Sequence, residues 1–171
     1  MPRFVAFLRG VSPMNAKMPA LKAAFEAAGF TQVRTVLASG NVVFDTDETE
    51  EAVIERRAEA AMAREMGRSF FTIVRPVARL LEILSDPPFE AHGIPPHAKR
   101  VVSFQRAARA PQVPLPLAQD LASVFLCTGR EVFTAYVPTD NGPVFMNLIE
   151  RAFGTELTTR TWETVARCAA A

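Results

Sequence analysis

Two stretches of the sequence recur in the same order in its two halves, and this recurrence constrains the fold more than any other feature. The segment RVVSFQRA at 100–107 repeats the pattern of RFVAFLRG at 3–10, with Arg, Val, Phe and Arg in register. Further along, VFLCTGREVF at 124–133 matches TVLASGNVVF at 35–44 at Leu, Gly, Val and Phe. Two matches in one order indicate an internal duplication, so we expect two similar halves.

The first half alternates strand and helix patterns in the order β-α-β-β-α-β. β-branched and aromatic runs predict strands, and apolar residues at helical spacing predict helices. Ser39, Gly40 and Asn41 mark a tight turn between two strands. The expected elements are a strand at 3–8, a helix from Pro19 to Gly29, a hairpin within 31–45, a helix at 49–66 and a strand at 69–74. This order is typical of a ferredoxin-like antiparallel sheet with two helices on one face.

The second half is shorter, because prolines at 111, 114 and 116 replace part of the first helix. Asp140 and Asn141 precede Pro143 in a capping arrangement for a helix that ends before Gly154, and a last helix is expected from Thr161 to about Ala169. We therefore predict an α+β protein of two ferredoxin-like halves. The halves are residues 1–84, with an extra short helix at 77–84, and residues 99–171, joined by a Pro-rich link at 85–98.

Composition describes a globular chain without a strong charge preference. Of 171 residues, 49% are hydrophobic, which is enough for a sizeable core, and the formal net charge is only +1. Bulk charge therefore favours neither nucleic acid nor an anionic membrane as a partner. No apolar run approaches the roughly 20 residues of a spanning helix, and we expect no export signal at the N-terminus. We expect a soluble, cytoplasmic protein of unspecified oligomeric state.

The motifs of several common enzyme classes are missing from the sequence. It has neither of the Gly-rich phosphate-binding patterns and no Gly-x-Ser-x-Gly elbow. His92 and His97, with Glu90, offer too few ligands in a loop for a structural zinc site. Cys127 and Cys168 have no CxxC spacing and are expected to be buried apolar side chains. We expect no cofactor and no metal, and whether the protein is an enzyme stays open.

Polar residues gather at the ends of strands and the starts of helices. Arg9 and Lys17 flank the start of the first helix, where free backbone N–H groups and the helix dipole favour an anion. Arg160 and Trp162 stand at the start of the last helix, with Thr158 and Thr159 as candidate caps. The alternative is that Arg9 pairs with a carboxylate, Lys17 is solvated and the single Trp anchors the last helix to the core.

Four motifs spread over nearly the whole chain carry a resemblance to a known family. LRGV after the first strand, SGNVVF at the hairpin, GREVF in the second half and TTRTW before the final helix resemble the bacterial family called domain of unknown function 1697. The resemblance implies a soluble α+β protein of two ferredoxin-like halves, and it implies no reaction. Its polar motif positions in this chain are Arg9, Gly10, Ser39, Gly40, Asn41, Asn147, Arg160 and Trp162.

The opening loop departs from the family pattern. Many members continue with INVGG, whereas this chain has VSPMN, in which Pro13 and Met14 lack the backbone freedom of a Gly pair. A backbone cradle for an anion is therefore not expected in this loop. The side chains of Ser12, Asn15 and Lys17 are expected to take over its binding contacts.

Three functions remain as hypotheses. The first is a binding or regulatory protein whose inter-half cleft holds a small anionic or polar ligand, with Arg9, Lys17, Asn41 and Arg160 as contacts. The second is an enzyme of phosphate or acyl chemistry that uses the same cluster, with Ser39 as nucleophile and a base that the sequence does not place. The third is a nucleic-acid or protein interaction module. RNA binding is disfavoured because the strand NVVFD offers a single aromatic residue for base stacking.

Overall fold

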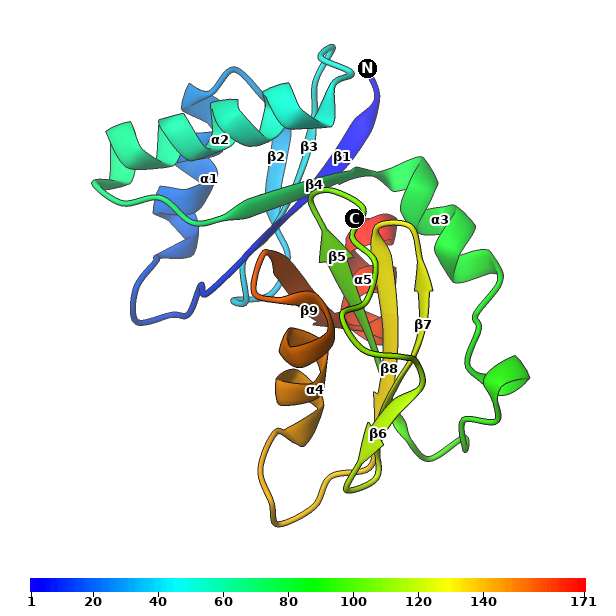
Figure 1. Ribbon diagram of the computed structural model, residues 1–171. Coiled ribbons are helices and arrows are strands. Elements are labelled where there is room, and N and C mark those ends of the chain that lie inside the picture. Colours follow the sequence, from blue (N-terminus) through cyan, green and yellow to red (C-terminus); the bar gives the residue numbers. More distant parts are fainter. The chain divides into compact units, whose positions relative to one another are not determined.

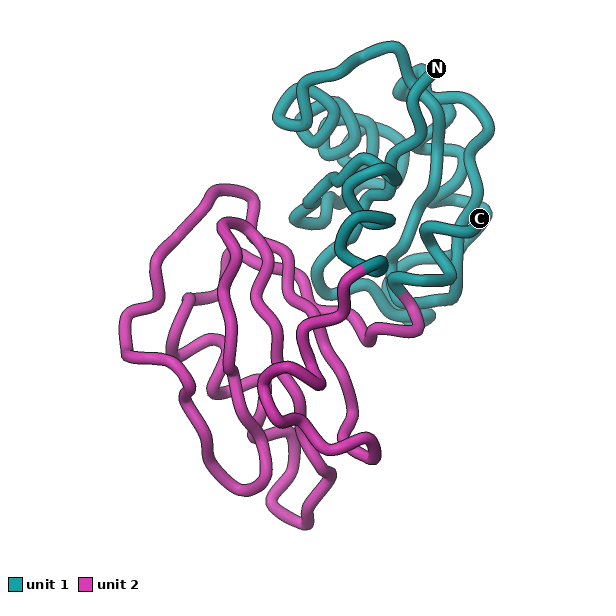
Figure 2. The backbone as a smooth tube through the Cα atoms, turned by 90° about the vertical axis from the view of Figure 1, so that its right-hand side faces the viewer, with its two compact units in different colours: residues 1–85, 165–171 teal, residues 86–164 magenta.

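The computed structural model describes residues 1–171 and contains two antiparallel sheets, of four and five strands, together with five α-helices (Figure 1). The chain forms two compact units (Figure 2). The first comprises Met1–Ser85 and Val165–Ala171, and the second comprises Asp86–Thr164. The α+β class expected from the sequence is confirmed. The terminal residues 165–171, expected in the second half, belong to the first unit.

The first unit has the element order that the sequence predicts. Its sheet runs in the order β2-β3-β1-β4, and every pair of neighbouring strands is antiparallel. Helix α3 follows β4 directly and contacts both β1 and β4. The elements are β1 (Arg3–Leu8), α1 (Met18–Ala27), β2 (Thr31–Thr35), β3 (Asn41–Asp45), α2 (Glu51–Met66), β4 (Thr72–Pro76) and α3 (Val77–Ser85).

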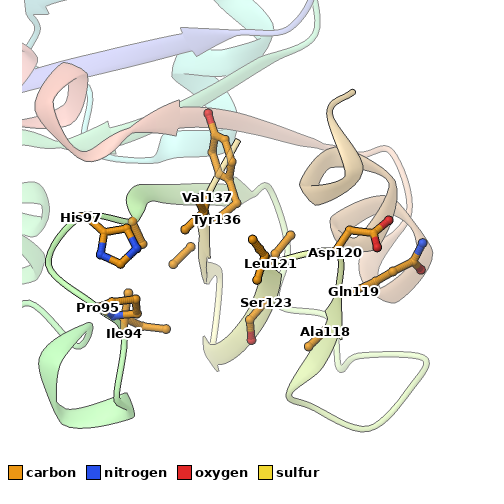
Figure 3. Close-up of a pocket in the computed structure, with 13 residues that line it drawn as sticks. Ile94, Pro95, His97, Ala118, Gln119, Asp120, Leu121, Ser123, Tyr136 and Val137 are labelled. Atoms are coloured by element: carbon orange, nitrogen blue, oxygen red, sulfur yellow. The ribbon is translucent and has the colours of Figure 1, made fainter. Parts of the chain in front are cut away.

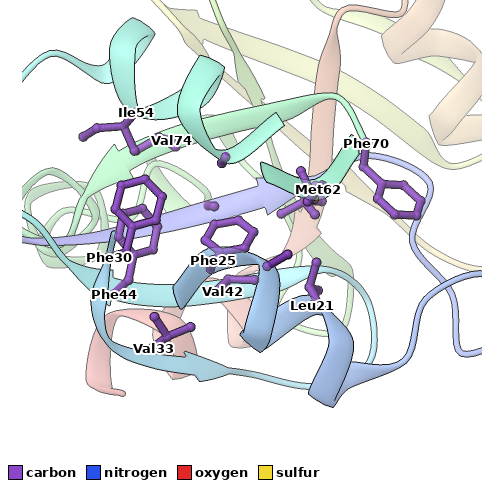
Figure 4. Close-up of a cluster of buried hydrophobic side chains, with 14 of the residues drawn as sticks. Leu21, Phe25, Phe30, Val33, Val42, Phe44, Ile54, Met62, Phe70 and Val74 are labelled. Carbon is purple, nitrogen blue, oxygen red and sulfur yellow. The ribbon is translucent and has the colours of Figure 1, made fainter. Parts of the chain in front are cut away.

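The core of the first unit lies between its sheet and the helices α1 and α2 (Figure 4). Successive strand residues point to opposite faces, so every second residue of β1 meets the helices. Three rings form the centre of this core, with the Phe44 centroid 4.4 Å from that of Phe30 and 5.6 Å from that of Phe25. The other large members of the cluster are Phe4, Leu8, Leu21, Ile54, Met62, Phe70 and Val74.

Two carboxylates of α2 protect the exposed edge of this sheet. Strand β4 is an edge strand, so alternate N–H groups have no neighbouring strand to pair with. Glu55 Oε2 accepts a hydrogen bond from the Val74 N–H at 3.0 Å, and Glu59 Oε2 accepts one from the Thr72 N–H at 3.0 Å. Helix α2 thus satisfies backbone donors that would otherwise offer a pairing site to another chain.

The second unit is built on a five-stranded sheet in the order β6-β7-β8-β5-β9. One face packs against α4 through Val124, Val132, Leu148 and Phe153. No helix lies between β5 and β7. The segment between them contains the prolines at 111, 114 and 116 and leads into the short strand β6. The elements are the 3₁₀ turn η1 (Glu90–His92), β5 (Lys99–Gln105), β6 (Leu117–Gln119), β7 (Ala122–Thr128), β8 (Glu131–Tyr136), α4 (Val144–Phe153) and β9 (Leu157–Thr161). Helix α5 (Trp162–Ala170) begins in this unit, and its residues from Val165 onward belong to the first unit.

The expectation for the segment before the last helix was wrong. Thr158, Thr159 and Arg160 are not a helix start, because they form strand β9, paired with β5 through Thr159 and Ser103. Threonine is favoured both at helix caps and in strands, and pairing with a distant strand decides between the two here. The residue that caps α5 is Thr161, whose Oγ1 accepts from the Thr164 N–H at 3.2 Å.

The capping arrangement expected before α4 is also absent. The helix begins after Pro143, which makes no side-chain capping hydrogen bond. Asn141 is used elsewhere, because its Nδ2 donates to Oδ2 of Asp120 at 3.3 Å. The start of α4 is therefore set by the fixed φ of proline and by the apolar face of the helix.

Candidate functional site

The loop between β1 and α1 is held by the side chain of Asn15. Its Oδ1 accepts from the Ser12 N–H at 2.9 Å, and its Nδ2 donates to the Gly10 carbonyl at 2.8 Å. Gly10 has a φ of +81°, a conformation that favours glycine. The sequence predicts the Asn15 amide as a ligand contact, but both its oxygen and its nitrogen make hydrogen bonds that hold the loop backbone.

The turn between β2 and β3 is held in a similar way by Asn41. This side chain is fully buried, and its Nδ2 donates to the Val36 carbonyl at 2.9 Å and to Oγ of Ser39 at 3.0 Å. Ser39 itself is exposed. Asn41 therefore shapes the turn, and the hydroxyl of Ser39 is the group that the turn presents to solvent.

Loop and turn lie against each other at one end of the first sheet. The Leu8 N–H donates to the Gly40 carbonyl at 2.8 Å, and the Arg9 N–H donates to the Phe71 carbonyl at 2.9 Å. A Cβ at Gly40 would lie only 2.8 Å from Cβ of Val11, so the two backbones approach as closely as glycine allows. We call the juxtaposed residues Arg9, Gly10, Ser39 and Gly40 the loop–turn site.

Lys17 is an exposed candidate in the first unit. It occupies the residue before α1, makes no side-chain cap, and directs Nζ to the Pro13 carbonyl at 3.5 Å. The N-terminus of a helix carries a partial positive charge, and the Lys17 ammonium adds to the positive potential there. Lys17 adds positive charge next to the loop but is not fixed by a buried contact.

The remaining candidates, Asn147, Arg160 and Trp162, belong to the second unit. Asn147 is exposed on α4, and the Arg160 guanidinium donates from Nη1 to the Thr159 carbonyl at 2.8 Å. The Trp162 ring packs edge-on against Phe89, with centroids 5.0 Å apart. Trp162 is thus part of an aromatic cluster of the second unit, as the alternative interpretation of the sequence expected.

Sequence reasoning missed a hollow of about 550 Å³ in the second unit (Figure 3). It is lined by the Pro-rich link, by the β6–β7 hairpin and by the end of β8, with Ile94, His97, Leu121, Ser123 and Tyr136 among its residues. Its mostly apolar lining contains no recognised motif. The signal that could have found it, small residues opposite one another on three strands, depends on a strand register that the sequence does not show.

The two histidines and two cysteines do not form a metal site. No three His, Cys, Asp or Glu side chains are grouped so that they could hold a metal ion. His92 Nδ1 lies 2.8 Å from the Pro88 carbonyl oxygen, and its ring stands 5.1 Å from that of Phe125. Both cysteines are free thiols, and burial raises the pKa of the Cys127 thiol. None of the helices combines the length and the apolar character needed to cross a bilayer.

Comparison with known proteins places the fold and the family. A solved structure described as the conserved bacterial protein SP0830 from Streptococcus pneumoniae is similar over 99% of this chain and 97% of its own, with a TM-score of 0.70 and 15% identity. At that identity the likeness concerns the fold alone. No curated protein matches the sequence. A model of the family described as protein of unknown function DUF1697 matches residues 1–133, well over half of the chain, and the protein therefore belongs to that family.

Proposed function

We propose that the protein binds a small polar or anionic ligand at the loop–turn site of its first unit. The observation that carries this proposal is the close approach of two loops that are distant in sequence, because a Cβ added at Gly40 would lie 2.8 Å from Cβ of Val11. The approach requires glycine at position 40, and the neighbouring Asn41 is buried, although Ser39 in the same turn is exposed. Rigid loops that present polar groups from a fixed scaffold are the usual carriers of binding function.

The chemistry of the site suits an anion. A guanidinium such as that of Arg9 donates two parallel hydrogen bonds to a carboxylate or phosphate. The Ser39 hydroxyl accepts from Asn41, and a hydroxyl group is both a donor and an acceptor of hydrogen bonds. Lys17 raises the positive potential near the same loop. Two of these three residues, Arg9 and Lys17, are positively charged, and the set contains no carboxylate, which favours a ligand that carries at least one negative group.

The contact identified at the Ser39 hydroxyl favours binding over catalysis. A serine nucleophile needs a base that accepts its proton, and one group that contacts Oγ, at 3.0 Å, is the donor Nδ2 of Asn41. A side-chain amide does not act as a base. The loop–turn site therefore offers recognition groups, and we do not extend the proposal to a reaction.

We infer that the two units descend from one ferredoxin-like ancestor by duplication. Without the short strand β6, the second sheet has the order β7-β8-β5-β9, which is that of β2-β3-β1-β4 in the first. Each unit places a helix before its last strand, and α3 and α5 follow those strands directly. The first copy keeps Gly10 after its Arg, whereas the second has Ala107 after Arg106, and this difference favours the first copy as the place of the proposed ligand site.

A thermal-shift screen tests the binding proposal. The wild type is screened with metabolites that carry a carboxylate or phosphate, and a ligand at 100 times its dissociation constant should stabilise the protein by about 2.7 kcal/mol. Arg9→Gln should remove the stabilisation, whereas Arg34→Gln, at an exposed arginine of β2, should retain it. A panel in which nothing stabilises the wild type, or in which Arg9→Gln responds like the control, rules the proposal out.

A further inference from the structure

The hollow in the second unit has a flat floor made of small side chains. Ala118 of β6 lies opposite Ser123 of β7, and Ser123 lies opposite Ala135 of β8. Residues that are directly opposite one another in neighbouring strands point to the same face of the sheet. Three small side chains in one row across three strands leave a shallow depression, whereas larger residues there would fill it.

The walls of the hollow come from two other segments. Figure 3 shows His97 and Pro95, from the Pro-rich link, across the hollow from Leu121 and Ser123 of the hairpin. Val137, at the end of β8, fixes the hairpin turn because its N–H donates to the Leu121 carbonyl at 3.0 Å. Floor and walls therefore belong to hydrogen-bonded structure, and the hollow is held open by the fold.

The hairpin turn is strained where it borders the hollow. Asp120 and Leu121 form a two-residue loop with φ values of +48° and +65°, which Gly and Asn normally supply. A leucine in this conformation is unusual and strained, and this one is 68% exposed. A strained, exposed apolar side chain at the wall of a hollow is the combination that a ligand contact would account for. Leu37, in the turn between β2 and β3, also combines a φ of +60° with 42% exposure, but it lies outside this hollow.

We propose that this hollow, here called the hairpin pocket, binds a small, uncharged, planar molecule of one or two fused aromatic rings. A volume of about 550 Å³ is within the range of small-molecule sites, which is about 300–1,000 Å³. The ring lies on the row of Ala118, Ser123 and Ala135, and its faces and edges meet Ile94, Pro95 and Leu121. Planarity follows from the flat floor, and neutrality follows from the mostly apolar lining.

Two polar side chains orient the bound ring. The Ser123 hydroxyl lies in the floor, and the His97 imidazole stands in the wall, where it can donate or accept one hydrogen bond from the edge of the ring. The carboxylate of Asp120 accepts from Asn141 at 3.3 Å and is turned to that partner. The pocket thus offers one neutral hydrogen-bonding edge opposite an apolar wall. It lies within the second unit and does not depend on the loop–turn site.

The test is an NMR titration with 2-naphthol, and with decahydro-2-naphthol as a probe of the same hydroxyl but puckered rings. We expect 2-naphthol to shift the amide signals of Ile94, His97, Ala98, residues 118–123 and residues 135–137 along one saturable curve, and to bind at least about tenfold more tightly than its saturated analogue. Ser123→Leu, which fills the floor, should weaken binding by at least tenfold, and His97→Ala by severalfold. Ala110→Leu, in an exposed loop outside the pocket, should change nothing.

Three results would overturn the proposal. They are shifts that stay linear with concentration or spread outside these residues, equal affinity for the two probes, and unchanged affinity in Ser123→Leu. If the amide spectrum shows that Ser123→Leu does not fold, Ala118→Leu takes its place, because that floor residue is exposed. Arg9→Gln should leave the titration unchanged, so failure here and failure at the loop–turn site are distinguishable.

Discussion

The close approach of Gly40 to the β1–α1 loop makes Gly40→Ala a sharp test of the loop–turn site. The added Cβ would lie 2.8 Å from Cβ of Val11, 3.0 Å from its Cγ2 and 3.2 Å from Cβ of Leu8. Two of these neighbours are Cβ atoms, which cannot move without their backbones. The residue also has a φ of +86°, which an alanine adopts only with strain.

Two effects set how much Gly40→Ala lowers the free energy of unfolding. Left-handed backbone costs a residue with a Cβ about 1–2 kcal/mol. Overpacking by one methyl group in a tight environment costs about 1–3 kcal/mol. We therefore expect Gly40→Ala to lower the free energy of unfolding by about 2–5 kcal/mol, which is a large part of the roughly 5–15 kcal/mol of a typical domain.

Gly67→Ala is the matched control. Gly67 ends α2 with a φ of +73°, and a Cβ built there meets no atom within 4 Å. This variant carries the backbone term alone and should lose about 1–2 kcal/mol. Urea unfolding followed by circular dichroism measures both variants against the wild type. Equal losses in the two variants would refute the reasoning, because they would show that the contact with Val11 contributes nothing.

Three further predictions concern stability and reactivity. Glu55→Ala leaves the Val74 N–H without its acceptor and should lower the free energy of unfolding by about 1–3 kcal/mol, with a smaller loss in Glu55→Gln, as urea unfolding would show; identical losses would contradict the acceptor role. The hydrogen bond from Arg3 lowers the pKa of the Asp45 carboxyl. The pair therefore stabilises the fold fully above the unfolded carboxyl pKa of about 3.9, and this stabilisation is lost as the pH falls through the lower folded pKa. Arg3→Ala should therefore cost at most about 1 kcal/mol at neutral pH and remove that acid-dependent part, and an unchanged stability–pH curve would speak against it. Burial raises the pKa of the Cys127 thiol, so its alkylation by iodoacetamide should be slower than that of free cysteine at neutral pH and accelerate at alkaline pH, and a rate like that of free cysteine would count against the burial.

The fold of the first unit was predictable from local pattern. The spacing of apolar residues in the sequence distinguishes its strands from its helices. The residues Ser, Gly and Asn around Gly40 are typical of a tight turn before β3. The last strand of the second unit was not predictable in this way. A threonine run such as that of β9 suits a strand and a helix cap equally, and only the partner strand β5, far away in sequence, decides.

The sequence located polar residues in the two loops of the first unit but did not show what each side chain contacts. Sequence reasoning found Asn15 and Asn41 as polar residues in loops, yet their amides hold the backbone of those loops. A sequence does not contain the distances between atoms, so it does not show which side chains make internal hydrogen bonds. The hairpin pocket escaped for a related reason, because its floor exists only once Ala118, Ser123 and Ala135 are aligned by strand register.

The binding of an anionic ligand at the loop–turn site can be read directly from the amide signals of its two glycines. Glycine amides fall in their own region of an NMR spectrum, and Gly10 and Gly40 belong to the site whereas Gly67 and Gly129 do not. Titration with the strongest phosphate- or carboxylate-bearing hit should shift Gly10 and Gly40 with a single shared dissociation constant and leave Gly67 and Gly129 in place. Shifts of all four glycines, or of neither Gly10 nor Gly40, would contradict the assignment of ligand binding to this site.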